Sequence, residues 1–106
     1  MYDLLKFQKD IIENKKNHNF NTTDLNMEFC LAHGELSEAY IAMLKKQDDV
    51  GEELADATIY ILGIAELLGI DLGHEIEKKI EKNKTRIYKM NNKGVLVKED
   101  ELNENK

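Results

Sequence analysis

The chain has 106 residues, of which 42% are hydrophobic and 34% charged, with a formal net charge of −6. This composition is typical of one folded domain and not of a disordered chain. The acidic balance argues against binding to a nucleic-acid polymer, whose backbone is usually bound by a basic surface. The single cysteine, Cys30, excludes a disulfide or a Cys-ligated zinc site within one chain, and we expect a reducing, cytoplasmic location.

The chain contains no proline, so its helices must end at glycines and capping residues. Asp3 is a candidate cap for a first helix that runs to about Lys16, with an expected apolar stripe of Leu4, Leu5, Ile11 and Ile12. Thr22 or Thr23 can cap a second helix. Its apolar side chains recur at helical spacing: Leu25, Phe29, Ala32, Leu36, Tyr40 and Met43.

A third helix is predicted from Asp49 to about Leu68, with Gly69 as its stop. Its apolar run, residues 57–72, is interrupted by acids and is shorter than the ~20 residues of a membrane span, so we expect a buried helix and no membrane partner. A fourth helix, capped by Asp71, should carry Ile87 and Met90 and end in residues 91–94.

Together these elements predict an all-α, four-helix bundle with short connections and antiparallel neighbours. The domain should cover residues 1–94. Residues 95–106 should form a short, partly flexible tail in which Val95, Leu96 and Val97 are either a short strand or packed side chains. A domain of this size has a modest core, so an oligomer would help to stabilise it.

Two pairs of acidic residues, each spaced by three, lie in the second and third predicted helices. Residues three apart share one helix face, so Glu35 projects with Glu38, and Glu53 projects with Asp56. The surrounding positions are apolar, and no lysine lies within four residues of any of the four acids. Because buried carboxylates are costly without a partner, a divalent cation such as Mg²⁺ would offset their charge.

The same acids also have an ordinary interpretation. Acidic residues number 21 of 106, so pairs at this spacing arise by chance on solvated helix faces. The fourth predicted helix adds a second pattern, because Lys79, Asn83 and Arg86 recur at spacings of four and three and Tyr88 follows. Such a stripe suits an anion with several oxygens, such as a polyphosphate, although a lysine-rich helix is often only a soluble surface.

In combination, the segments HGELSEAY, EELADATIYILGIAELLGIDL and KKIEKNKTR resemble the MazG-like nucleotide pyrophosphohydrolases of the all-α NTP pyrophosphatase superfamily. The resemblance covers roughly residues 1–94. One departure is Gly34, which stands where many members have a further glutamate. The resemblance implies an enzyme, a hydrolase that cleaves a nucleoside triphosphate between the α- and β-phosphates to give a monophosphate and pyrophosphate.

Carried over position by position, the resemblance implies roles for eight residues and a cofactor. The metal ligands would be Glu35, Glu38, Glu53 and Asp56, with Mg²⁺ as the expected ion and Mn²⁺ as the alternative. Apart from the resemblance, the chemistry needs a carboxylate that is left partly uncoordinated to act as general base, and Glu38 is our candidate for that role. The phosphates would be contacted by Lys79, Asn83, Arg86 and Tyr88.

The resemblance also implies a homodimer or a tetramer built as a dimer of dimers, with the nucleoside where two subunits meet. The aromatic candidates for contact with the base are Phe7, Phe20, Tyr40 and Tyr60. An alternative from another class remains open at this stage: a non-catalytic helical module for nucleotide sensing or protein interaction. Mg²⁺-dependent thermal stability would distinguish a metal site from surface acids.

Overall fold

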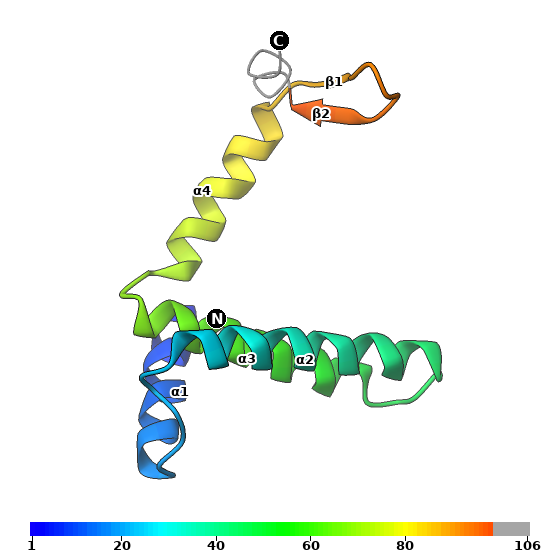
Figure 1. Ribbon diagram of the computed structural model, residues 1–106. Helices are drawn as coiled ribbons and strands as arrows, with labels where there is room; N and C mark the ends of the chain where they lie inside the picture. The colour runs from blue at the N-terminus through cyan, green and yellow to red at the C-terminus, as the bar shows by residue number, and fades with distance from the viewer. Residues whose placement is uncertain (99–106) are drawn as a thin grey trace. The chain divides into compact units, whose positions relative to one another are not determined.

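A computed structural model describes residues 1–98 of the chain, which are largely helical (Figure 1). This confirms the predicted all-α class with four helices. Residues 99–106, most of the expected tail, lie outside the described part, and the domain boundary at residue 94 stays a prediction. The elements are α1 (Leu4–Asn17), α2 (Leu25–Leu44), α3 (Val50–Leu67), α4 (Leu72–Thr85), β1 (Tyr88–Met90) and β2 (Leu96–Lys98).

The chain divides into two compact units, Met1–Gly73 and His74–Lys106. In the first unit α3 packs against both α1 and α2. Its core contains several alanines, whose small side chains let neighbouring helix backbones approach closely. The buried apolar residues are Ile12, Ala39, Ala42, Ala57, Leu62, Ile64 and Ala65.

The helix ends show which capping predictions hold. The Asp3 side chain accepts a hydrogen bond from the Lys6 amide at 3.2 Å, which confirms this cap. The predicted caps of α2, Thr22 and Thr23, are wrong, because Asp24 accepts from the Met27 amide at 3.1 Å instead. The Asn21 side-chain oxygen accepts from the Asp24 amide at 3.0 Å, so a local turn holds Asp24 in the capping position.

The two ends of α3 differ. Asp49 precedes the first residue of α3 as predicted, but its side chain makes no capping hydrogen bond. At the other end Gly69 has a φ of 71°, a left-handed conformation that glycine adopts without strain. The amides of Gly69 and Ile70 donate to the carbonyls of Glu66 and Ala65, at 3.1 and 2.8 Å. This is a Schellman ending, and it confirms Gly69 as the stop.

The predicted extension of the fourth helix through Ile87 to Met90 is wrong. After Thr85 the chain forms an antiparallel hairpin in which Tyr88 pairs with Lys98 and Met90 with Leu96. The Asn91 side-chain oxygen accepts from the amides of Lys93 and Val95, both at 2.9 Å, and closes the turn. Pairing of these two short segments across the turn therefore outweighs one further helical turn.

The buried face of α1 is more polar than predicted. Of the expected stripe only Ile12 is buried, and Leu5 is 37% exposed. Gln8, fully buried, donates to the Ile70 carbonyl at 2.7 Å and accepts from the Leu72 amide at 3.0 Å. Its side chain also donates to Glu66 at 3.3 Å. These three hydrogen bonds offset the cost of burying the Gln8 amide and connect α1 to the segment that follows α3.

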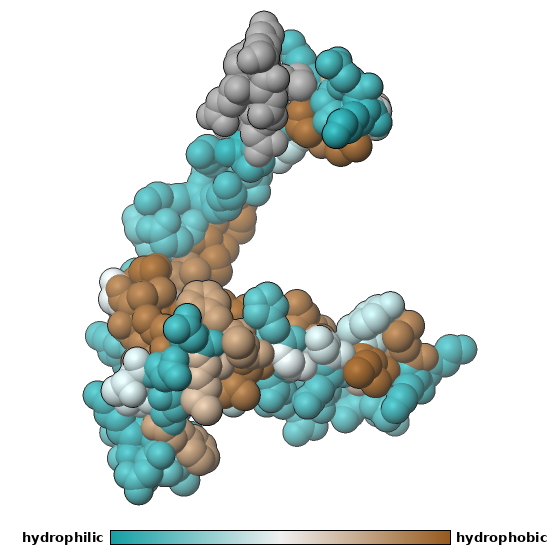
Figure 2. All heavy atoms as spheres, in the orientation of Figure 1, coloured by the Kyte–Doolittle hydropathy of each residue, from teal (hydrophilic) through white to brown (hydrophobic). Residues whose placement is uncertain are grey.

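Several large apolar side chains of α2 and α3 reach the surface. The predicted stripe of α2 is largely exposed: Phe29 at 48%, Leu36 at 55%, Tyr40 at 58% and Met43 at 51%. The predicted buried third helix likewise leaves Leu54 and Ile61 about half exposed, at 48 and 49%. Apolar residues are visible among polar ones over α2 and α3 in Figure 2. Within residues 1–98, no helix has the combined length and hydrophobicity that a membrane crossing requires.

Candidate metal centre

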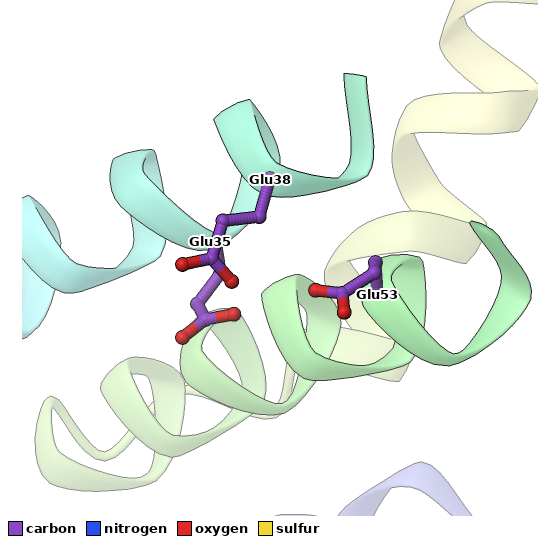
Figure 3. Close-up of side chains that lie close together, drawn as sticks. All are labelled: Glu35, Glu38 and Glu53. Atoms are coloured by element: carbon purple, nitrogen blue, oxygen red, sulfur yellow. The ribbon is translucent and has the colours of Figure 1, made fainter. Parts of the chain in front are cut away.

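Three carboxylates converge between α2 and α3 (Figure 3). Glu35 and Glu38 project together from α2, as residues three apart on a helix do, and Glu53 reaches toward them from the first turn of α3. One oxygen of each side chain lies within 4.8 Å of the other two. The short loop after α2 makes α3 run back alongside it (Figure 1), which brings residues far apart in sequence to one place.

Asp56, the fourth predicted acid, is half-buried and does not belong to this tight group. It lies one turn after Glu53 on α3. Its negative charge nevertheless contributes to raising the pKa of both Glu35 and Glu53, so it acts on the same region. The structure therefore brings together three of the four predicted ligands and leaves the fourth at the edge.

Glu53 is the most exceptional member of the cluster. Its Oε2 atom is buried and has no hydrogen-bond partner within the described residues. Burial raises the pKa of Glu53 above its ordinary value, and the negative charges of Glu38, Asp49, Asp56 and Glu35 raise it further. A buried carboxylate oxygen with no partner is costly, so this position favours either a proton or a cation.

Glu35 is affected in the same direction. Burial raises its pKa most, followed by the charge of Glu38, a hydrogen bond with Glu38 and the charge of Asp56. None of the salt bridges formed among residues 1–98 includes one of these four acids. The negative charge of the cluster is thus not neutralised by a lysine or arginine of the described chain.

Two turns before Glu35 on α2, Glu28 belongs to a buried ion pair that the sequence analysis did not identify. Lys15 of α1 donates to Oε1 of Glu28 on α2 at 2.5 Å, and the side chains are only 11% and 2% exposed. Asn21 donates to the other oxygen of Glu28 at 3.1 Å, and the Lys15 ammonium lies 4.7 Å from the centroid of the Tyr60 ring. The one available signal was the spacing of Gln8, Ile12 and Lys15 on one face of α1.

The predicted phosphate contacts lie in the second unit. Lys79 and Asn83 are exposed on α4, four residues apart on one face as predicted. Arg86 and Tyr88 are not helical, because α4 ends at Thr85 and Tyr88 begins β1. Arg86 still joins Asn83, since its Nη1 donates to the Asn83 side-chain oxygen at 3.3 Å. The predicted single helical stripe is corrected, and the binding role of these residues stays a prediction.

Gly34, the departure from the family pattern, lies on α2 directly before Glu35. A side chain at this position would meet no atom within 4 Å. The glycine is therefore not required by close packing within the first unit. A carboxylate at residue 34 would be sterically possible, and its absence leaves α2 with one acidic pair in this region.

The chain belongs to the MazG-like family, whose sequence model matches residues 22–102. Among solved structures it is similar to a MazG-like pyrophosphohydrolase of cyanophage S-2L, solved with dGDP and three catalytic Mn²⁺ ions per active site. The TM-score is 0.67 and the identity 22%, over 92% of this chain and 98% of that one. At this level of identity the likeness establishes the fold. No curated protein matches the chain.

Proposed function

We propose that this protein is a nucleotide pyrophosphohydrolase that requires a divalent metal ion, Mg²⁺ or Mn²⁺. It adds water across the bond between the α- and β-phosphates of a nucleoside triphosphate and releases a nucleoside monophosphate and pyrophosphate. The observation that carries the proposal is the convergence of Glu35, Glu38 and Glu53, with an unpartnered, buried oxygen on Glu53. Membership of the MazG-like family supports it, as do the nucleotide and Mn²⁺ ions of the phage structure.

The residues present fit a hard divalent cation. Carboxylate oxygens are the ligands that Mg²⁺ and Mn²⁺ prefer. Ligands of an octahedral Mg²⁺ ion are about 3 Å apart when adjacent and about 4.2 Å apart when opposite. The three oxygens, which lie within 4.8 Å of one another, would therefore have to move closer by up to about 2 Å to bind one ion. Asp56 would complete the set from the next turn of α3. When bound, the ion neutralises phosphate charge and activates water.

The three acids would have different roles, according to how exposed each side chain is. Glu35 and Glu53 are partly buried, so their positions are well defined for holding a cation. Glu38 is exposed, and it would accept the proton of the attacking water and pass it to solvent. In the second unit, Lys79 and Arg86 would bind the departing pyrophosphate, with Asn83 fixing the guanidinium and Tyr88 nearby.

The test is to incubate the purified protein with each NTP and dNTP and Mg²⁺ or Mn²⁺, and to separate the products. We expect monophosphate and pyrophosphate in equal amounts. Glu38→Gln should lower kcat at least about 100-fold, since a general base usually contributes that much. The control is Glu52→Gln, the same substitution at an exposed glutamate that neighbours Glu53 in the first turn of α3 but lies outside the cluster, and it should retain wild-type activity.

Each other result points to a different conclusion. Diphosphate and orthophosphate would show another reaction on this scaffold. No turnover by a folded protein with any nucleotide would favour the non-catalytic sensing or interaction module. Equal activity of Glu38→Gln and Glu52→Gln would remove Glu38 from the mechanism.

The proposal includes self-association as a dimer or a dimer of dimers. The half-exposed apolar residues of α2 and α3 are more than a monomer of this size would normally leave in contact with water. A second copy is the simplest partner, because its own α2 and α3 carry the same unpaired surface. Light scattering after size-exclusion chromatography should give at least twice the monomer mass of 12.3 kDa, and Tyr40→Glu together with Leu36→Glu should reduce it.

A further inference from the structure

A cavity of about 330 Å³ lies between α1 and α3 and the loop after α1. The side chains that matter here are Asp10, Asn14, Lys15, Phe20, Ile59 and Tyr60. The volume is at the lower end of the range for sites that bind small molecules. All of these residues belong to the first unit, so the cavity is formed within a single protomer.

Along α3, the cavity lies one turn beyond Asp56 and two turns beyond Glu53. Tyr60 follows Glu53 by seven residues and Asp56 by four, so it lies on the same face of α3, about 6 Å beyond Asp56 along the axis. On α2, Glu28 precedes Glu35 by seven residues and is bonded to Lys15, which lines the cavity. A ligand with phosphates at the acids would need only a sugar to reach this cavity.

The walls combine an aromatic surface with polar groups. Phe20 is 58% exposed, so its ring is open to a flat ligand. The backbone amide of Phe20 donates to the Lys15 carbonyl at 2.8 Å, which fixes the loop at this residue. The His18 ring stacks on the Phe20 ring, with centroids 5.5 Å apart. The Asn14 amide has donors and an acceptor for the edge of a base, and the Asp10 carboxylate accepts.

A second cavity, of about 280 Å³, lies between α2 and α3 and is a weaker candidate. Phe29, Leu36 and Ile61 form much of its wall, and His33 is the one polar side chain that lines it. A base placed there would lose hydrogen bonds to water and regain few of them. The cavity between α1 and α3 is therefore the better match to a base.

We propose that the cavity between α1 and α3 binds the base of the nucleotide, with Phe20 as its stacking surface. The proposal rests on the proposed function, since it places the base of that same substrate. It replaces the expectation that the base lies only where two subunits meet. Of the four aromatic candidates from the sequence, it selects Phe20 and Tyr60.

The kinetic test compares a nucleoside triphosphate with 2-deoxyribose 5-triphosphate, which has the sugar and phosphates but no base. Phe20→Ala should lower kcat/KM for the preferred nucleotide roughly tenfold, as loss of a stacking ring usually does, and leave the abasic compound unaffected. Phe20→Leu, which keeps apolar bulk and guards against a folding defect, should show the same selective loss. Tyr2→Ala is the control, because Tyr2 is an aromatic residue exposed at 87%, lies before α1 and does not line the cavity.

A binding test separates this proposal from the proposed activity. Unphosphorylated nucleosides are added to the ¹⁵N-labelled protein without metal, and amide shifts are followed by NMR. Shifts centred on Asn14, Phe20 and Tyr60 would support the site even if no nucleotide were hydrolysed. Shifts centred on His33 and Ile61, no shift at millimolar nucleoside, or equal loss on both substrates in Phe20→Ala would each overturn it.

Discussion

Glu28 and Glu53 both place carboxylate oxygens inside the same three-helix unit, yet their partners differ completely. The oxygens of Glu28 accept from Lys15 at 2.5 Å and from Asn21 at 3.1 Å. Glu53 has a buried oxygen with no partner in the described chain. Burial raises the pKa of Glu53, and the negative charges of four other acids raise it further. The fold can thus supply a lysine to a buried acid, and at the carboxylate cluster it does not. We infer that the missing cation comes from solution.

The largest expected change in stability comes from removing the lysine of the buried Lys15–Glu28 pair. Lys15→Met retains the apolar stem and leaves Glu28 buried without its cation, which should cost about 3–5 kcal/mol of unfolding free energy. Urea denaturation of the two proteins measures the difference. Lys16→Met, at the exposed neighbouring position, should change stability by no more than about 0.5 kcal/mol. If Lys15→Met lowers the free energy of unfolding by less than about 1 kcal/mol, the Lys15–Glu28 pair does not contribute substantially to the stability of the fold.

The carboxylate cluster should gain stability from an added ion, whereas the Lys15–Glu28 pair loses stability when its own cation is removed. Mg²⁺ or Mn²⁺ at about 100 times its Kd should stabilise the wild type by about 2.7 kcal/mol, measured as a rise in Tm. Glu53→Gln should raise stability without metal, because it removes a repelled carboxylate, and should abolish the gain with metal. An equal gain in Glu53→Gln would place the stabilising ion elsewhere.

A smaller effect is expected at the neutral partner of Glu28. Asn21→Ala removes one hydrogen bond to a charged group, which is usually worth about 2 kcal/mol, and it also removes the turn that places the Asp24 cap. Asp24→Ala alone measures the capping part, at about 1 kcal/mol. If the two variants lose equal stability, the bond from Asn21 to Glu28 contributes nothing.

The stability of the metal-free protein should also depend on pH through the carboxylate cluster. Because the pKa of Glu53 and of Glu35 is raised above the ordinary 4.5, the folded chain binds more protons than the unfolded chain just above that pH. These groups therefore stabilise the fold increasingly as pH falls through the window, and this contribution is lost as pH rises. Without metal, the stability of wild type should approach that of Glu53→Gln on acidification. A constant difference would contradict the raised pKa of Glu53.

Local signals in the sequence were sufficient for much of the fold. Asp3 caps α1 and Gly69 ends α3, because each acts through bonds to its own neighbours. Thr22 and Thr23 failed as caps because Asn21 organises the turn around Asp24. The hairpin after Thr85 could not be anticipated from helical spacing, since it depends on pairing of Tyr88 with Lys98 across a turn.

The candidate site, like the fold, contains features that the sequence predicted and features that it did not. The spacing of Glu35 and Glu38 predicted that they share one face of α2. Their convergence with Glu53 was only permitted by that spacing, and it depends on the short loop that turns α3 back along α2. The pair of Lys15 and Glu28 joins residues thirteen apart on different helices, which no helical period reveals. The spacing of the apolar residues of α2 predicted a helix, but spacing alone does not show that Phe29, Leu36 and Tyr40 are about half exposed.

The central claim is that the carboxylate cluster holds a divalent ion, and Mn²⁺ tests it most directly. Bound Mn²⁺ broadens the NMR signals of nearby amides, so substoichiometric Mn²⁺ added to the ¹⁵N-labelled protein reports the position of the ion. The account predicts selective broadening around residues 35–38 and 53–56, and its absence in Glu53→Gln. Broadening that is uniform over the chain, or centred on acidic residues outside the cluster, would contradict it.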